Sequence, residues 1–347
     1  GRGRVWVLHP VTGAIVKTFI TPAGFGNPSS GLGLTHLASP VEPGSGSVVR
    51  FRWGGDLSGN VWRIDLNAAD GSAPVRIARL EDASGAAQPV TAAPVIGPVP
   101  GSATRMFVYL GTGQYFSVDD VPGTSTPNAF ASQVQTIYGI VDDTSVGSPG
   151  LPNIRHSGGT CPSSGGNGDF ACQTATVEAD GSLTVSHNTV DLASKRGFYL
   201  DIPVTGARVN TQPALGIGGT LVVVVNVPSN IICNPGGSSF LLALSGVAGG
   251  AVQRVVGGAD YFSAYYSLGD KLSSRPVLVR TSSRASGPDD GGGGAGGGGG
   301  GGGGGNCPRQ NALTHGSDTS VDSTGVPCTE NPGTGGAVRR IYLRPLN

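Results

Sequence analysis

The sequence predicts an all-β protein: a modified β-propeller, complete or incomplete, with long loop insertions tied by disulfides. Short runs of alternating apolar and polar residues follow one another along most of the 347 residues, separated by turns rich in Gly, Asp and Ser. Sustained helical periodicity is absent, and many of the 61 glycines lie outside the single polyglycine run. Loosely similar blocks of roughly 40 to 50 residues favour propeller blades over a sandwich.

Two hairpins open the chain. Residues 4–8 alternate, pass through a turn with Pro and Gly, and return as residues 14–20. Residues 48–53 and 60–66 are two alternating runs around the turn Gly54–Gly59. We expect Asp56 to Asn60 to form a tight turn and Trp62 to be buried between strands.

The same pattern predicts further strands downstream. Only residues 191–195 and 261–268 are candidate helices, and both are short, so helix content should be small. The predicted strands are 105–110, 114–118, 135–141, 197–202, 220–227, 240–244, 275–281 and 337–344.

We interpret residues 1–347 as one domain with two surface insertions, at about 142–183 and 282–332. The first has too few apolar residues to build a core, and the second contains the polyglycine run 291–305, which predicts a flexible tether. The segment 338–344 is then available to complete a sheet. Since no initiator Met or signal peptide precedes the first strand, we expect an upstream N-terminal region outside this sequence.

The charge balance favours neither nucleic acid nor membrane as a partner. The 22 Lys and Arg residues equal the 22 Asp and Glu residues, and only 13% of residues are charged. Such a composition provides no basic footprint for nucleic acid or anionic lipid. The apolar run 221–225 is far shorter than the about 20 residues that cross a bilayer. We therefore predict no nucleic-acid binding and no membrane insertion.

The five cysteines form no zinc-binding C-x-x-C pair, and most lie in Gly/Ser/Pro-rich segments. We pair Cys161 with Cys172 and Cys307 with Cys328, which leaves Cys233 free or bonded to a part of the protein outside this chain. Each closure could contribute roughly 2 to 4 kcal/mol, and stable disulfides imply export from the cytoplasm. The alternative is a set of reduced thiols in a cytosolic protein.

Standard catalytic motifs, such as G-x-S-x-G, H-E-x-x-H and the P-loop, are missing. Neighbouring carboxylates on an extended chain point to opposite faces, so we interpret Asp119-Asp120, Asp142-Asp143 and Asp289-Asp290 as turn formers. The five histidines are isolated from one another in the sequence: His9, His36, His156, His187 and His315. We predict that the protein is not an enzyme.

The string Gly55-Asp-Leu-Ser-Gly-Asn-Val-Trp-Arg-Ile-Asp-Leu66 is the most specific signal in the sequence. With five further segments in order, among them 88–94, 109–116 and 197–203, it resembles the C-terminal propeller of the PilY/PilC-type pilus proteins. The resemblance covers residues 1 to about 281 and the closing strand 338–344. Its motif residues here are Gly55, Asp56, Gly59, Asn60, Trp62 and Asp65.

The resemblance implies a protein at the tip of bacterial type IV pili, at the cell surface after export through the periplasm. It implies roles in surface adhesion, pilus assembly and opposition to retraction, and partners among the minor pilins and the protein's own N-terminal region. An incomplete propeller offers unpaired sheet edges, so we expect a joint made by backbone pairing that depends weakly on salt. On this hypothesis Ile341→Pro abolishes tip incorporation, whereas neutralising Arg339 matters little.

Family members commonly carry a calcium loop just before this string, and the sequence departs from that pattern. The four acidic positions fall on Glu42, Gly44, Gly46 and Arg50, so one carboxylate remains and a guanidinium stands where the last ligand would be. We predict no calcium at this degenerate loop and no other cofactor.

Two alternatives stay open. One is a secreted carbohydrate-binding propeller, in which aromatic side chains stack on sugar rings. The other is a quinoprotein-like propeller enzyme, because the Val5-Trp6 unit also resembles the repeats of such enzymes. The aromatic residues considered for sugar stacking are Tyr261, Phe262, Tyr265 and Tyr266.

Overall fold

The computed structural model describes residues 1–27, 29, 31–40, 48–158, 160–216, 218–230, 236–256, 259–280 and 310–326. In these ranges the chain forms strands β1–β22 and one short 3-10 helix, η1 (Val118–Asp120). The strands are β1 (Arg4–Leu8), β2 (Ile15–Ile20), β3 (Leu34–Ala38), β4 (Phe51–Asp56), β5 (Asn60–Asp65), β6 (Val75–Arg79), β7 (Val95–Pro98), β8 (Arg105–Gly111), β9 (Gln135–Asp143), β10 (Ala171–Gln173), β11 (Ala175–Val177), β12 (Leu183–Val185), β13 (Gly197–Ile202), β14 (Ala214–Leu215), β15 (Thr220–Pro228), β16 (Gly237–Ser245), β17 (Val252–Val256), β18 (Ala259–Ser263), β19 (Tyr265–Gly269), β20 (Val277–Arg280), β21 (Gln310–His315) and β22 (Val321–Val326).

Four sheets carry the architecture. The first sheet has the order β3-β4-β5-β6, the second β7-β8-β9-β13-β10, the third β14-β15-β16-β19 and the fourth β20-β21-β22. Pairing is antiparallel throughout these sheets except between β10 and β13, which are parallel. The pairs β1-β2, β11-β12 and β17-β18 are separate two-stranded ribbons.

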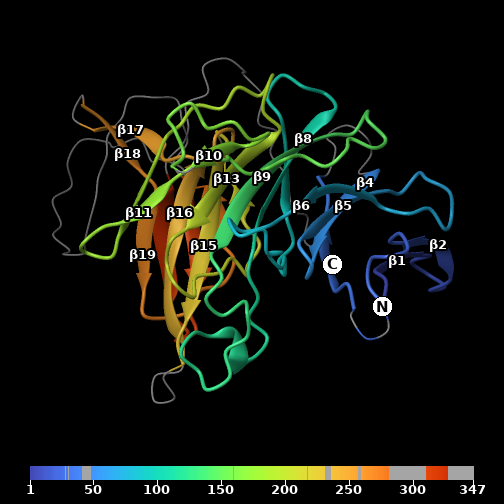
Figure 1. Ribbon diagram of the computed structural model, residues 1–347, viewed down its shortest axis with the longest axis horizontal. Coiled ribbons are helices and arrows are strands. Elements are labelled where there is room, and N and C mark those ends of the chain that lie inside the picture. Colours follow the sequence, from blue (N-terminus) through green and yellow to red (C-terminus); the bar gives the residue numbers. More distant parts are fainter. Residues whose placement is uncertain are drawn as a thin grey trace, which may run out of the picture.

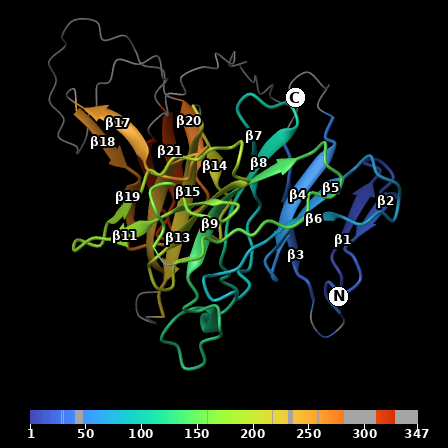
Figure 2. The same cartoon turned by 45° about the horizontal axis from the view of Figure 1, so that its top comes forward.

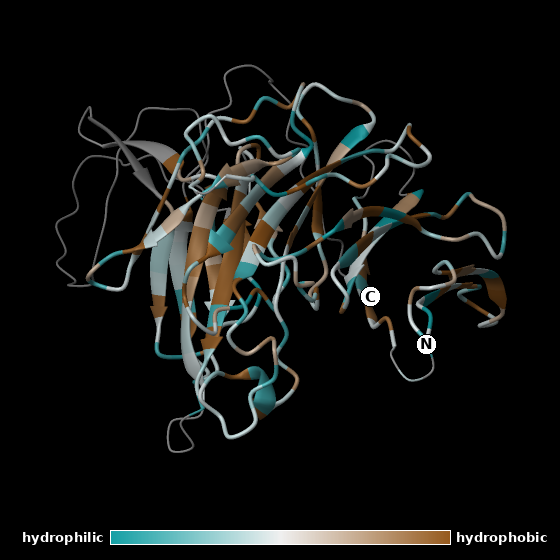
Figure 3. Ribbon diagram, in the orientation of Figure 1, coloured by the Kyte–Doolittle hydropathy of each residue, from teal (hydrophilic) through white to brown (hydrophobic). Residues whose placement is uncertain are grey.

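The sheets pack face to face in chain order. Figure 2 shows the hairpin β1-β2 beside the first sheet, then the second, with the third and fourth sheets beyond it. One hydrophobic cluster joins the first and second sheets, another the second and third, and another the third and fourth. Apolar residues concentrate on the strands in the middle of this arrangement (Figure 3), which are labelled in Figure 1. The described sheets do not close into a ring, which is consistent with a modified propeller.

Strand β15 shows why continuous apolar runs occur in this sequence. Because side chains alternate between the two faces of a strand, Val223 and Val225 enter the cluster shared with the second sheet, while Val222 and Val224 enter the cluster shared with the fourth. A strand covered on both faces requires apolar residues at successive positions. The predicted strand 220–227 is confirmed for this reason.

The predicted hairpins 4–8 with 14–20 and 48–53 with 60–66 are also confirmed, with pairs such as Arg4 with Ile20 and Trp53 with Arg63. Low helix content holds in the described part of the chain, where 191–195 is a turn and 261–268 is occupied by the strands β18 and β19. In those ranges, no helix has the length and apolar character to cross a membrane.

The predicted strand 114–118 is wrong. The backbone N–H groups of Phe116 and Ser117 and the side chain of Gln114 all donate hydrogen bonds to the Asp120 carboxylate, at 2.6–3.0 Å. These bonds turn the chain into the capped helix η1. Burial would raise the pKa of Asp120, but these three bonds and a fourth from the Asn128 amide hold it below its usual value.

Both proposed insertions are wrong in part. Residues 142–183 begin within β9 and return to the far edge of the second sheet as β10, parallel to β13, and Ile154 and Phe170 between these strands are buried in the core. Part of the second assignment is wrong, since residues 310–326 form β21 and β22 and extend β20 into the fourth sheet. These strands carry few large apolar residues, so their pattern was weak. The polyglycine run and the closing strand 338–344 lie outside the described residues.

The predicted disulfide between Cys161 and Cys172 is present. Cys172 is buried in the cluster between the first and second sheets, and Cys161 packs against that cluster, so the bond fastens the loop after β9 to the second sheet. Cys233, Cys307 and Cys328 lie outside the described residues.

Candidate functional site

The motif hairpin, residues 55–66, is organised around the Asp56 carboxylate. This group accepts hydrogen bonds from the backbone N–H of Ser58 and Asn60, from the Asn60 amide and from the Trp62 indole, at 2.7–3.2 Å. Burial raises the pKa of Asp56, and these donors oppose the rise. The expected tight turn and the burial of Trp62 are both confirmed.

The two motif glycines are required by close approaches of the chain. Gly59 has a φ of +78°, and a Cβ there would lie 2.5 Å from the carbonyl oxygen of Leu80. A Cβ on Gly55 would lie 2.4 Å from side-chain atoms of Val90. The motif string therefore specifies a turn that packs against the segment after β6.

The last motif carboxylate, Asp65, pairs at the surface with Arg50 at 3.0 Å. Burial alone would raise the pKa of Asp65, but its bonds with Arg50 and the Asn67 backbone hold it below the usual value. Arg50, which stands at the last position of the degenerate calcium loop, is thus engaged by Asp65. Glu42, Gly44 and Gly46 lie outside the described residues. Within the described ranges, no group of three or more His, Cys, Asp or Glu side chains could hold a metal.

A buried ion pair between Arg63 and Asp142 was missed by the sequence analysis. The two groups are 2.9 Å apart, and their side chains are 4% and 0% exposed. Asp142 also accepts a hydrogen bond from the Trp53 indole at 2.7 Å. Asp143 does form a turn, through Ser145, but interpreting Asp142 as a turn former is wrong because its carboxylate faces the first sheet.

The aromatic residues considered for sugar stacking do not form an exposed platform in the described part. Tyr265 packs on Phe240 with ring centroids 5.3 Å apart, and Tyr266 packs against the cluster between the third and fourth sheets. The side chains of Tyr261 and Phe262 lie outside the described residues.

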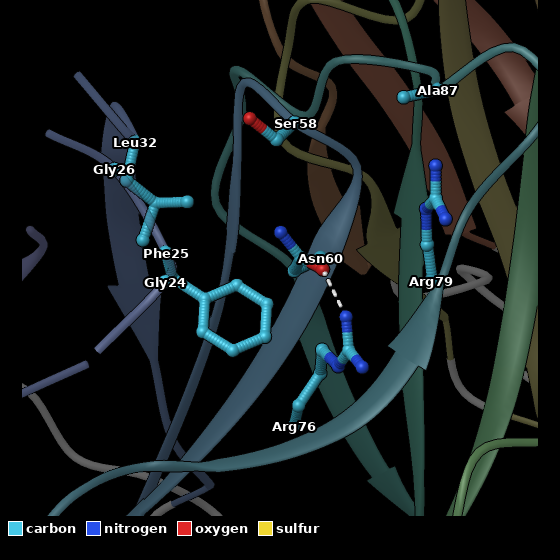
Figure 4. A pocket seen from close by; sticks show the side chains of 9 residues that line it. All are labelled: Gly24, Phe25, Gly26, Leu32, Ser58, Asn60, Arg76, Arg79 and Ala87. Atoms are coloured by element: carbon cyan, nitrogen blue, oxygen red, sulfur yellow. Dashed lines mark hydrogen bonds between the residues drawn. The ribbon is translucent and has the colours of Figure 1, made fainter. Parts of the chain in front are cut away.

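An open pocket lies directly beside the motif turn (Figure 4). Its volume is about 300 Å³, and residues 24–26 with Leu32, the motif turn and strand β6 provide most of its wall. Phe25 packs edge-on against Trp62 at 5.0 Å and lies under the Arg76 guanidinium at 4.7 Å. The pocket is lined by Gly24, Phe25, Gly26, Leu32, Ser58, Asn60, Arg76, Arg79 and Ala87.

Residues 4–166 match a protein family described as "PilY1 beta-propeller domain". This region contains the motif hairpin, the pocket and the buried ion pair. This region of the chain is similar to the PilY1 β-propeller domain. This confirms the resemblance to the PilY/PilC-type pilus proteins that the motif residues indicated.

Named relatives and a solved structure agree with this assignment. The chain is 28% identical to the type IV pilus biogenesis factor PilY1 of Pseudomonas aeruginosa strain PAO1, over 72% of the chain and 23% of that protein. It is 26% identical to a PilY1 homolog of Xylella fastidiosa, over 72% of the chain and 17% of that protein. The chain therefore spans about a quarter or less of these relatives.

The fold is similar to the crystal structure of the Pseudomonas aeruginosa PilY1 C-terminal domain, with a TM-score of 0.63 and 19% identity. This likeness covers 96% of the chain and 67% of that domain. It confirms the predicted modified propeller.

Proposed function

We propose that this chain is the propeller domain of a type IV pilus tip protein that acts in surface adhesion, in pilus assembly and against retraction. The PilY1 family match, together with relatives named type IV pilus biogenesis factors, is the observation that carries the proposal. The domain acts through binding and not through catalysis. In support, the sequence lacks the standard catalytic motifs.

The protein reaches the pilus tip at the bacterial cell surface by export through the periplasm. The disulfide between Cys161 and Cys172 supports this route, because such bonds persist in oxidising compartments. No calcium is bound at the degenerate loop, where Arg50 faces Asp65. Calorimetric titration with calcium tests this point, and tight binding that disappears in Glu42→Ala would contradict it.

The partners are minor pilins and the protein's own N-terminal region, joined by backbone pairing at a sheet edge. Strand β1 offers such an edge. The backbone N–H and C=O of Thr18 in β2 bond outward to Asp70 and Gly71, so the pair formed by Trp6 and Thr18 is not hydrogen-bonded within the hairpin. The Trp6 backbone must then face away from β2, where the described residues provide no further strand.

The exposure of apolar side chains also supports the β1 edge as the site of backbone pairing. Trp6 and Leu8 of β1 are 51% and 55% exposed, and Ile15 opposite Leu8 is 61% exposed. An added strand would pair with the open backbone and cover these apolar groups.

Immunogold labelling of filaments tests the proposal in a bacterium that carries this gene. The wild-type protein should label filament ends, and deletion of the gene should reduce both the number of surface pili and attachment to surfaces. Trp6→Pro should remove the label from the ends, whereas Trp6→Thr, which keeps the β1 backbone donor, should retain it. Normal piliation and attachment after deletion would contradict the proposed role. Loss of the label in high salt, with Trp6→Pro still attached, would show that the joint is electrostatic.

A further inference from the structure

The pocket beside the motif turn holds an arginine whose position is fixed by the motif. The Asn60 amide nitrogen donates to both oxygens of Asp56, at 3.2 and 3.0 Å, so the Asn60 carbonyl oxygen must face the other way. That oxygen accepts a hydrogen bond from Nη1 of Arg76 at 3.1 Å, and Figure 4 shows this contact as a dashed line. The buried carboxylate thus orients Arg76 through one intermediate residue.

Arg76 retains donors that the fold does not use. Its Nε and Nη2 groups have no hydrogen-bond partner among the described residues, and the Ser58 hydroxyl at the pocket rim also has none. The ring of Phe25 supports the guanidinium from one side. A preorganised guanidinium with free donors is suited to bind a carboxylate.

A second guanidinium adds positive charge to the same pocket. Arg79 lies on the same strand and pairs with Glu81 at 2.9 Å, whereas no described ion pair engages Arg76. Burial lowers the pKa of Arg76, the nearby charge of Arg79 lowers it further, and the Asp56 carboxylate opposes this shift only in part. An anionic ligand would relieve this repulsion.

We propose that this pocket binds an acidic sugar unit, a monosaccharide ring that carries a carboxylate. The carboxylate lies against Arg76 and Arg79, a ring hydroxyl reaches the Ser58 hydroxyl, and the carbon skeleton contacts Phe25 and Leu32. A volume of about 300 Å³ is at the lower end of the range for small-molecule sites, which fits one sugar ring. The proposal depends on the pocket alone and not on the pilus role.

Calorimetric titration of the purified chain with galacturonate, galactose and acetate separates the contribution of the carboxylate to binding from that of the sugar ring. Galacturonate should bind more tightly than both, and Arg76→Gln should weaken its binding by about tenfold or more. Arg79→Gln should weaken it less, because Arg79 also pairs with Glu81. Arg275→Gln is the matched control, since it removes the same charge from an exposed arginine outside the pocket and should leave binding unchanged.

Circular dichroism and thermal melting of Arg76→Gln test whether the variant remains folded. Should that variant unfold, Ser58→Ala provides the second test and should reduce galacturonate affinity severalfold without changing acetate binding. Equal affinities for galacturonate and acetate would overturn the assignment to a sugar. Wild-type affinity in folded Arg76→Gln, or galactose binding as tight as galacturonate binding, would overturn the carboxylate site.

Discussion

The two faces of the second sheet are held to their neighbours by different chemistry. Toward the first sheet, apolar residues are accompanied by the buried pair of Arg63 and Asp142, and Arg155 joins Asp201 to the backbone of Glu81 at 2.6–2.9 Å. Toward the third sheet, the cluster is larger and consists of apolar and aromatic residues, and no described ion pair crosses it.

The difference shows what each kind of interface specifies. Hydrogen bonds and ion pairs are directional, so the first interface defines the relative position of two sheets as well as their contact. Apolar burial is non-directional and contributes in proportion to area, so the second interface supplies mainly cohesion, and directional contacts such as the bond from the Gln173 amide to the Ala248 carbonyl lie beside its cluster. Substitutions on the two sides should therefore differ in kind as well as in size.

The largest effect is expected from Arg63→Ala at the polar interface. The substitution leaves the Asp142 carboxylate buried without its ion-pair partner and removes bonds to the backbone of Asp143 and Val146. It should lower the free energy of unfolding by about 3–5 kcal/mol, measured by urea denaturation. Arg79→Ala, which breaks an exposed pair, is the control and should cost less than about 1 kcal/mol. Equal losses in both variants would remove the distinction between the interfaces.

At the apolar interface, Leu242→Ala should lower the free energy of unfolding by about 2–5 kcal/mol. Leu242 is fully buried in the cluster between the second and third sheets, and its truncation leaves a cavity. Urea denaturation again measures the loss. The half-exposed Val177 of β11 is the control, because Val177→Ala should change stability by less than about 0.5 kcal/mol. A loss below about 1 kcal/mol in Leu242→Ala would mean that this interface is loosely packed.

Removing the disulfide with Cys161→Ser and Cys172→Ser together should cost about 2–3 kcal/mol, because the closed loop has a sequence separation of only 11. Arg155 lies just before Cys161 in the segment after β9, so the loss of stability should fall on the polar interface. Hydrogen exchange should show faster exchange in β10 and near Arg155 than in β15. Uniform acceleration across both interfaces would contradict this localisation.

The smallest expected effect is a pH dependence of the free energy of unfolding that is lost in Arg63→Ala. Burial raises the pKa of Asp142, while Arg63 and Trp53 oppose the rise, so removing Arg63 raises this pKa further. When a carboxyl has a higher pKa in the folded state than in the unfolded state, its protonated form favours folding. This contribution to stability is complete below the unfolded pKa of about 4 and is lost as the pH rises through the folded pKa. The loss in Arg63→Ala should thus be largest at neutral pH and decrease by about 1 kcal/mol or more toward pH 4, at about 1.4 kcal/mol per unit of pKa.

Urea denaturation at a series of pH values measures this trend. The loss in Leu242→Ala serves as the reference, since no titrating group is removed there, and it should stay constant over the same range. Parallel pH profiles for the two variants would contradict the assignment of Asp142 to a buried, charge-dependent contact.

The sequence predicted those parts of the fold whose determinants are local. The hairpins β1-β2 and β4-β5 follow from alternation and turn residues within about 17 residues, and the disulfide from two cysteines in a polar loop. The strand expected at 114–118 failed because a competing local determinant, the Asp120 carboxylate, collects the same backbone groups. Alternation alone does not show where backbone donors are used.

The site depended on contacts between distant parts of the chain. Arg63 and Asp142 are 79 positions apart, and Phe25 meets Arg76 from a loop that precedes the first sheet. The motif string indicated the turn but not the pocket, because nothing in the local pattern places Phe25 against Arg76 of β6. Such pairings are fixed by the packing of sheets and hairpins, which a single sequence does not display.

The packing of sheets in chain order also determines how the molecule carries mechanical load. Three separate hydrophobic clusters join neighbouring sheets, so a pull between the first and fourth sheets passes through the three interfaces in series. Hydrogen bonds and ion pairs depend on direction as well as distance, whereas apolar burial is non-directional. Under load, the polar interface should therefore resist sliding of its two sheets more than the interface between the second and third sheets does.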